Sequence, residues 1–186
     1  VQTNDTNTYA GSTIVSRSSA LVFTAVSSGA NGPLGDPGVG SSVEVFGTLV
    51  ASGASGSFQK SVPDASSNLY TVNLHPGSIL RLDNNGSNNN NRWADNVGIT
   101  LNGATFQLQA RNAAGGTTET IGAVTFNRGS TIQINRIGAF QDELTVADLT
   151  RSGTGDTLSL LYLAGSTGLG VAGTTAQERL LVTPLS

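Results

Sequence analysis

Apolar and polar residues alternate in short segments that are separated by turns rich in Gly, Asn and Ser. Alternation with a period of two is typical of β-strands that bury one face. Such segments occur at residues 42–46, 70–74, 98–101 and 123–126. Few segments have the Ala, Leu, Glu and Lys composition of stable helices, so the pattern predicts an all-β protein.

One template recurs along the chain: a glycine, two residues, an apolar residue, one further residue and a second apolar residue. It starts at Gly40, Gly77, Gly103 and Gly129, and the last three are each 26 residues apart. Another alternating pair of apolar residues precedes each of these three glycines. Each unit therefore consists of a strand, a short turn, a second strand and a longer connection. Glycine suits a tight corner where a side chain would clash or where φ is positive.

A fixed period in the twenties is a signature of repeat architectures, in which each unit buries its apolar face against its neighbours. It favours a parallel β-solenoid with two or three strands per coil. A β-sandwich is the alternative, but the chain lacks a regular Asn-Gly hairpin signal. We predict one solenoid domain over residues 1–186, as part of a larger or processed parent protein. Its inward side chains should stack in columns at Val43, Val45, Val72, Leu74, Leu80, Leu82, Ile99, Leu101, Phe106, Leu108, Val124, Phe126, Ile132 and Ile134.

The composition narrows the class of protein further. The chain of 186 residues is 37% hydrophobic but only 11% charged, against roughly a quarter charged in an ordinary domain. The formal net charge is −3 and the nine basic residues are scattered, so nucleic-acid binding has little support. The longest apolar run, residues 158–164, is too short to span a membrane. Cysteine is absent and so is methionine, even at position 1, and we therefore expect a processed or excised piece.

Residues 84–96 contain seven asparagines and the only tryptophan, Trp93. The segment falls in the longer connection between coils, and asparagine suits loops because it tolerates left-handed backbone geometry and bonds its own backbone. We predict a structural corner, with Trp93 packed over the edge of a coil. Two alternatives stay open, a sugar platform on Trp93 and a calcium loop. Calcium ligands would be Asp83, Asn85, Ser87 and Asp95, but the glycine is misplaced for such a loop and no glutamate closes it.

Catalytic chemistry has weak support in the sequence. The acidic residues are dispersed, and the adjacent Asp142 and Glu143 would point to opposite faces of a strand. The single histidine, His75, precedes Pro76 at a turn and has no obvious acidic neighbour in sequence. No nucleophile elbow, phosphate loop or metal-ligand cluster occurs. We expect no enzyme activity, no catalytic residue, no cofactor and no metal site.

Four arginines occur near turns in successive units and could form a basic edge for acidic glycans. The simpler interpretation is isolated, solvated charges that discourage aggregation, and we predict the latter. The four residues are Arg92, Arg111, Arg128 and Arg136.

Several motifs together resemble a known family. The stretch NTYAGSTIV at residues 7–15 resembles the opening of the autotransporter-associated β-strand repeat, and ALVF at 20–23 and NGPLG at 31–35 fit its continuation. NRWADNVGITLNG at residues 91–103 is similar to a later element of the family. Further similarity occurs at 119–126 and 149–153, whereas 52–67 does not align. The resemblance implies a right-handed parallel β-helix from a bacterial surface or secreted protein.

The leading functional hypothesis is a structural β-solenoid of the bacterial exterior that serves as a stalk, sheath or fibre subunit. The alternative is an adhesin segment that binds glycans or another cell through its loops. A solenoid needs a cap at each end, and the chain finishes in an apolar, strand-like tail. We expect this tail to contact another copy head to tail, or the rest of a longer parent chain. The proposed assembly residues are Leu180, Leu181, Val182 and Leu185.

Overall fold

The computed structural model of the chain describes residues 11–24, 42–58, 71–111, 116–136, 140–162 and 178–183. These residues form β-strands β1 to β15 and contain no helix, which confirms the predicted all-β class. Accordingly, no described helix is long and apolar enough to cross a membrane.

The strands form three sheets. The first sheet contains β1 (Thr13–Val15), β3 (Ser42–Val45), β5 (Thr71–Leu74), β7 (Ile99–Asn102), β10 (Val124–Asn127) and β13 (Leu149–Arg151). The second sheet contains β2 (Ala20–Phe23), β4 (Thr48–Ala51), β6 (Ile79–Asp83), β8 (Thr105–Gln109), β11 (Ser130–Asn135) and β14 (Leu158–Tyr162). The third sheet contains β9 (Thr117–Ile121), β12 (Asp142–Val146) and β15 (Glu178–Val182).

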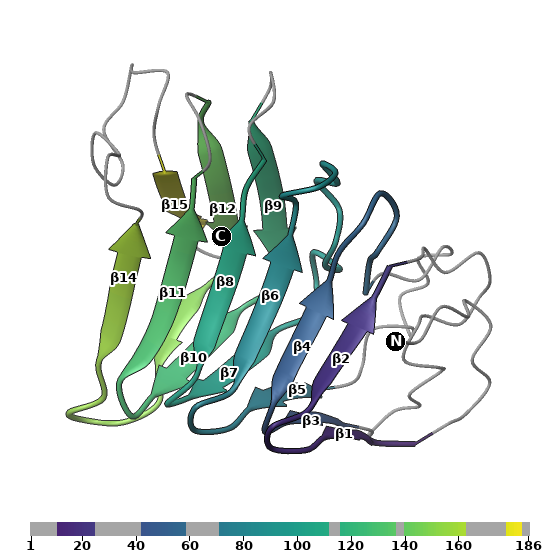
Figure 1. Cartoon of the computed structure of the whole chain (residues 1–186). Helices are drawn as coiled ribbons and strands as arrows, with labels where there is room; N and C mark the ends of the chain where they lie inside the picture. Colours follow the sequence, from purple (N-terminus) through teal and green to yellow (C-terminus); the bar gives the residue numbers. More distant parts are fainter. Residues whose placement is uncertain are drawn as a thin grey trace.

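Every strand pair in these sheets is parallel. The chain passes from the first sheet to the second through a short turn, and in its later part continues into the third (Figure 1). It then returns to the first sheet one layer farther along the stack. The fold is therefore the predicted parallel β-solenoid. Its right-handed sense stays a prediction.

Inward side chains stack in columns between the sheets. In the second sheet, for example, Leu80, Phe106 and Ile132 are consecutive register partners. Of the fourteen predicted inward positions, thirteen are buried, and Phe126 is partly buried against the same core. Alternation with a period of two explains this success, because burying one face of a parallel strand fixes its register. The prediction of stacked columns is confirmed.

The repeated glycines occupy the turns between the first and second sheets. Gly77, Gly103 and Gly129 have φ values of 80°, 63° and 71°, a conformation that side chains disfavour. A Cβ atom added to Gly103 would also lie 3.3 Å from the carbonyl oxygen of Arg128 in the next layer. Successive turns are bonded together, since the Gly77 N–H donates to the Gly103 carbonyl at 2.9 Å. Gly40, the fourth predicted turn residue, lies outside the described residues.

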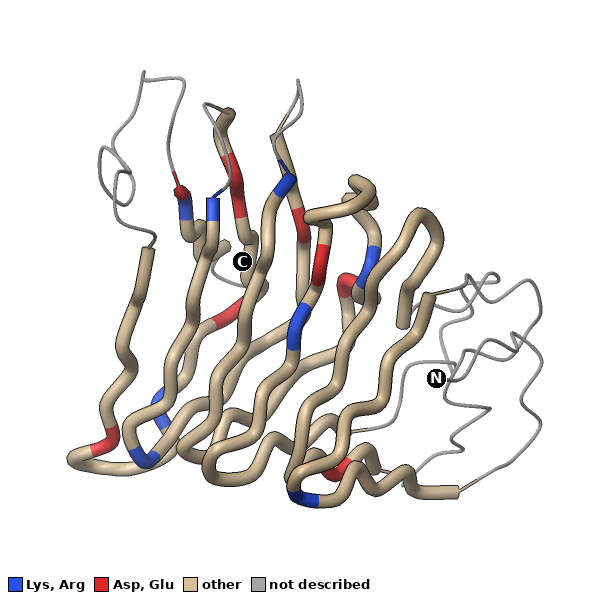
Figure 2. Tube along the Cα trace, in the orientation of Figure 1, with Lys and Arg blue, Asp and Glu red and all other residues tan. Residues whose placement is uncertain are grey.

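Charged residues lie mostly at strand ends and in turns, as Figure 2 shows. A row of hydrogen-bonded polar side chains crosses the outward face of the second sheet. Gln107 accepts a hydrogen bond from Arg81 and donates one to Gln133 at 3.0 Å. Side-chain ladders of this kind bind successive layers of a parallel sheet to one another.

Candidate functional site

The asparagine-rich segment is a loop between β6 and β7, as predicted. It packs between the loop that follows β4 and strand β9 of the third sheet. The Phe58 N–H donates to the Arg92 carbonyl at 2.7 Å on one side, and on the other the Thr118 N–H donates to Asn90 Oδ1 at 3.2 Å. Strand β9 is the first strand of the third sheet, so the loop covers an edge that would otherwise present unpaired backbone groups.

Most asparagine side chains described in this loop have a defined structural role. They accept hydrogen bonds from the backbone or from neighbouring side chains, which replaces the pairing that another strand would supply. Asn84 Oδ1 accepts the N–H of Asn89, and Asn89 Oδ1 accepts the N–H of Asn91. Asn88 Oδ1 accepts the Thr117 hydroxyl, and Asn90 Oδ1 accepts the N–H of Thr118.

Arg92 is the centre of this corner and is fully buried. Its guanidinium group donates to Asn84 Oδ1 at 2.7 Å and to the carbonyl oxygens of Gly53, Gly56 and Ser87 at 2.8, 2.5 and 2.9 Å. A buried guanidinium is tolerated only when its donors find acceptors. The prediction of a solvated Arg92 is wrong, because three loop carbonyls and an asparagine take the place of water.

Glu119 on β9 holds the same loop through two hydrogen bonds. Its two carboxylate oxygens accept the N–H groups of Arg92 and Trp93, each at 3.0 Å. Burial raises the pKa of Glu119 to about 8. These N–H groups and the charge of Arg92 act in the opposite direction and lower the pKa. Burial likewise lowers the pKa of Arg92, against the charges of Glu119 and Asp83, which raise it. The charge of each group therefore offsets only part of the effect of burial on the other.

Trp93 lies in the core with 1% of its surface exposed. Its indole N–H donates to the Val97 carbonyl at 2.8 Å. The ring packs edge to face on Phe58, with centroids 5.3 Å apart, and Phe58 packs in the same manner on Phe23 at 5.1 Å. The prediction that Trp93 packs against the coils is confirmed. A sugar platform on Trp93 is contradicted, since the ring has no free face.

The oxygens of the corner accept hydrogen bonds from Arg92 and from the backbone and are not arranged around a cation. Asp83 Oδ1 accepts the N–H of Asn85 at 3.0 Å, and the Ser87 carbonyl accepts the guanidinium. Among the described residues, no group of three or more His, Cys, Asp or Glu side chains is placed to hold a metal ion. A positive side chain at the centre of the loop disfavours calcium by repulsion.

His75 does have an acidic neighbour, which the sequence did not indicate. Its Nε2 lies 2.6 Å from Oε2 of Glu44, one layer earlier in the first sheet. The imidazole stacks on Phe46 with centroids 3.9 Å apart and 6° between the planes. Burial acts to raise the pKa of Glu44, but the hydrogen bonds from Asn73, His75 and Ser42 outweigh it and lower the pKa. The pair lies on the outward face, where it joins two layers.

Asp142 and Glu143 point to opposite faces of β12, as predicted. Glu143 faces outward and pairs with Arg179 at 2.9 Å, whereas Asp142 is fully buried and accepts the Thr117 N–H at 2.8 Å. The register partner of Asp142 is Glu178, which is also fully buried and accepts the Arg136 N–H at 3.1 Å. Burial raises the pKa of Asp142 to about 6; the Thr117 N–H opposes this, and the charge of Glu178 adds to it.

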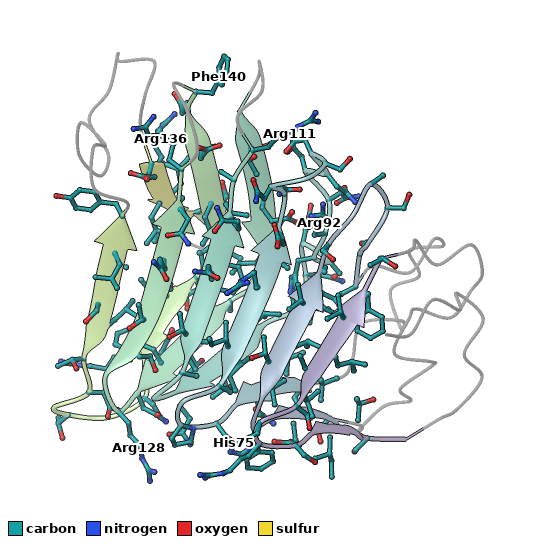
Figure 3. All side chains as sticks on the ribbon, in the orientation of Figure 1. His75, Arg92, Arg111, Arg128, Arg136 and Phe140 are labelled. Atoms are coloured by element: carbon teal, nitrogen blue, oxygen red, sulfur yellow. The ribbon has the colours of Figure 1, made fainter. Side chains whose placement is uncertain are left out.

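The four arginines do not share an edge. Arg128 lies at a turn between the first and second sheets, at one end of the second-sheet strands (Figure 3). Arg111 and Arg136 both lie near the other end of these strands. Arg128 is exposed, Arg111 and Arg136 are partly buried, and Arg92 is enclosed by the corner. A basic edge that includes all four arginines is therefore contradicted, whereas glycan binding itself stays a prediction. The interpretation as solvated charges fits Arg128 best.

The two ends of the solenoid differ in how well they bury their inward side chains. At the first layer, Val15 and Phe23 are 4% and 1% exposed. At the last layer, Leu160, Tyr162 and Val182 are 43%, 50% and 43% exposed. Leu160 and Tyr162 continue the columns of Ile132 and Ile134, so their exposure marks an unfinished core.

The predicted assembly residues lie partly at this end. Leu180, Leu181 and Val182 belong to β15, whose inner edge pairs with β12. Among the described residues, no strand pairs with the other edge of β15. Leu185 lies outside the described residues.

Comparisons with protein families, with curated proteins and with solved structures find no match for this chain. The parallel β-solenoid is established by the structure itself. The resemblance to autotransporter-associated repeats stays a prediction.

Proposed function

We propose that the chain is a non-enzymatic structural β-solenoid of the bacterial exterior, a segment of a stalk, sheath or fibre. The observation that carries the proposal is the unfinished C-terminal layer, where Leu160 and Tyr162 are half exposed although their register partners Ile132 and Ile134 are buried. Exposed apolar side chains that continue a core suit a joining surface better than a free one. The stack would continue with strands from another copy or from a longer parent chain.

The chemistry of the carboxylates supports a structural role over a catalytic one. A general acid or base must reach the substrate, but Glu119, Asp142 and Glu178 are enclosed by the fold. Each accepts backbone N–H groups from an adjacent loop or strand. Their role is to hold layers together. The bacterial exterior is proposed from the family resemblance, which the solenoid fold supports.

Sedimentation and electron microscopy of the purified chain test the joining of copies. We expect the native chain to form larger species as its concentration rises, and Leu160→Lys to keep it small by placing a charge in the apolar end. Ile14→Lys is the matched control, because Ile14 is 65% exposed but faces outward from the first layer. Small species at every concentration for all three proteins would contradict joining between copies. Retention of defined saccharides by native chain and Leu160→Lys alike would favour the adhesin alternative.

A further inference from the structure

Asn85 differs from its neighbours in the asparagine-rich corner. Its side chain is exposed and makes no hydrogen bond to any described residue, whereas the oxygens of Asn84, Asn88, Asn89 and Asn90 are all engaged. Its own N–H is bonded to Asp83 Oδ1 at 3.0 Å, which fixes the backbone on its N-terminal side. The carboxamide of Asn85 is therefore free to rotate.

The residue that follows Asn85 is the one that least obstructs an attack on this carboxamide. Gly86 is exposed, and a Cβ atom placed on it would meet nothing within 4 Å. Its N–H donates to no described residue. Glycine imposes no side-chain hindrance and allows wide backbone freedom, so the Gly86 nitrogen can approach the side-chain carbonyl carbon of Asn85.

We propose that Asn85 is a site of spontaneous modification, which converts to aspartate and isoaspartate through a cyclic imide. A base removes the proton of the Gly86 amide, and its nitrogen forms a bond to Cγ of Asn85. The bond from Cγ to the side-chain nitrogen breaks, and ammonia leaves with a proton from solvent. Water then adds to either carbonyl of the five-membered ring and opens it. The balance is asparagine and water to aspartate or isoaspartate and ammonia, without an oxidant or a cofactor.

The chain contains its own matched control at Asn102 and Gly103. This is the same dipeptide, but Asn102 ends strand β7 and Gly103 has a φ of 63°. The Gly103 N–H is engaged with the Asn127 carbonyl at 3.2 Å and the Ser130 hydroxyl at 3.1 Å. Attack would first have to break these bonds. A third Asn-Gly pair, residues 31 and 32, lies outside the described residues.

Modification would change the charge of the corner at a defined place. It adds one carboxylate two residues from Asp83, whose negative charge already acts on Arg92. Isoaspartate would also lengthen the backbone between residue 85 and Gly86, one residue before Ser87, whose carbonyl accepts the Arg92 guanidinium at 2.9 Å. The reaction therefore acts on the loop that covers the edge of the third sheet.

Peptide mapping by mass spectrometry of the folded chain, aged in mildly alkaline buffer, tests the proposal. We expect product at Asn85 to form at least roughly tenfold faster than at Asn102, the factor associated with freeing one backbone hydrogen bond. In denaturant the two rates should converge, because both dipeptides are then unprotected. Gly86→Ala should slow the reaction at Asn85 and leave the melting temperature unchanged, since the added methyl group meets no atom.

Two results would overturn the proposal. One is an Asn85 that survives ageing of the folded chain as well as Asn102 does. The other is an unchanged rate in Gly86→Ala, which would mean that the Gly86 nitrogen takes no part. Labelling by an isoaspartate-specific carboxyl methyltransferase separates the ring-opening route from direct hydrolysis, because direct hydrolysis yields aspartate alone.

Discussion

The apolar columns beneath the first two sheets and the polar corner beside the third sheet are both buried, but they hold the layers together differently. In the columns, residues such as Leu80 and Phe106 meet an apolar side chain in the next layer and need no partner of a particular kind. In the corner, Arg92 and Glu119 are equally inaccessible, yet each is bound to named donors or acceptors. Hydrophobic burial is non-directional, whereas a buried charge requires exact geometry.

The third side of a layer is completed in two ways within this fold. Where a third strand exists, as in β9 and β12, backbone pairing continues the stack. Where it does not, the asparagine-rich loop supplies side-chain oxygens to the exposed edge of β9. Asparagine suits this purpose because its side chain presents the same amide groups as the backbone.

The largest expected effect is in the apolar columns. Phe106→Ala should lower the free energy of unfolding by about 3–5 kcal/mol, because it removes a large buried ring and leaves a cavity. Chemical denaturation measures the change. Thr105→Ala, on the outward face of the same strand, is the control and should shift stability by no more than about 0.5 kcal/mol. An unchanged midpoint for Phe106→Ala would contradict the stacked core.

The next effect is in the corner. Arg92→Met keeps the length of the side chain but removes its charge and its donors, and should cost about 3 kcal/mol because it leaves the buried oxygens that accept the guanidinium without a hydrogen bond. Arg128→Met is the control: Arg128 is an exposed arginine in a turn and should tolerate the change. Equal melting temperatures for the two variants would mean that the corner contributes no more to stability than an exposed turn does.

The most gradual effect is on the pH dependence of stability. The pKa values of Glu119 and Asp142 rise to about 8 and about 6 from ordinary values of 4.5 and 3.8. Between its ordinary pKa and its raised pKa, each group is protonated in the folded chain and ionised in the unfolded chain. Stability should therefore fall as pH rises from about 4 to about 8. The lowered pKa of Glu44 acts in the opposite direction, with stability lost as pH falls below its ordinary value of 4.5.

Denaturation at a series of pH values measures this slope. Glu119→Gln should flatten it between pH about 6 and about 8, because the amide does not titrate. Glu143→Gln, an outward carboxylate on β12, should leave the slope in place. A flat profile through the same range in the native chain would show that Glu119 is ionised in the folded chain, held by its two N–H donors.

The layers of the solenoid can be predicted from the sequence alone. Alternation in segments such as 42–46, together with glycines 26 residues apart, was enough to predict the strands, their parallel stacking and the inward positions. This succeeds because the burial of alternate residues is a local pattern that repeats with the coil. Only Phe126 departs from it, in the column that ends at Arg151 in the last layer.

Which polar residues are buried depends on the tertiary structure. Arg92 lies beside asparagines in sequence and reads as a surface charge, but its acceptors at Gly53 and Gly56 come from the preceding layer. Likewise, Glu44 and His75 are 31 residues apart and meet because their strands are adjacent. Apolar burial depends on the kind of residue at a position, which the sequence states directly. A buried charge depends on where distant donors and acceptors converge in space, and this convergence is set only when the coils stack.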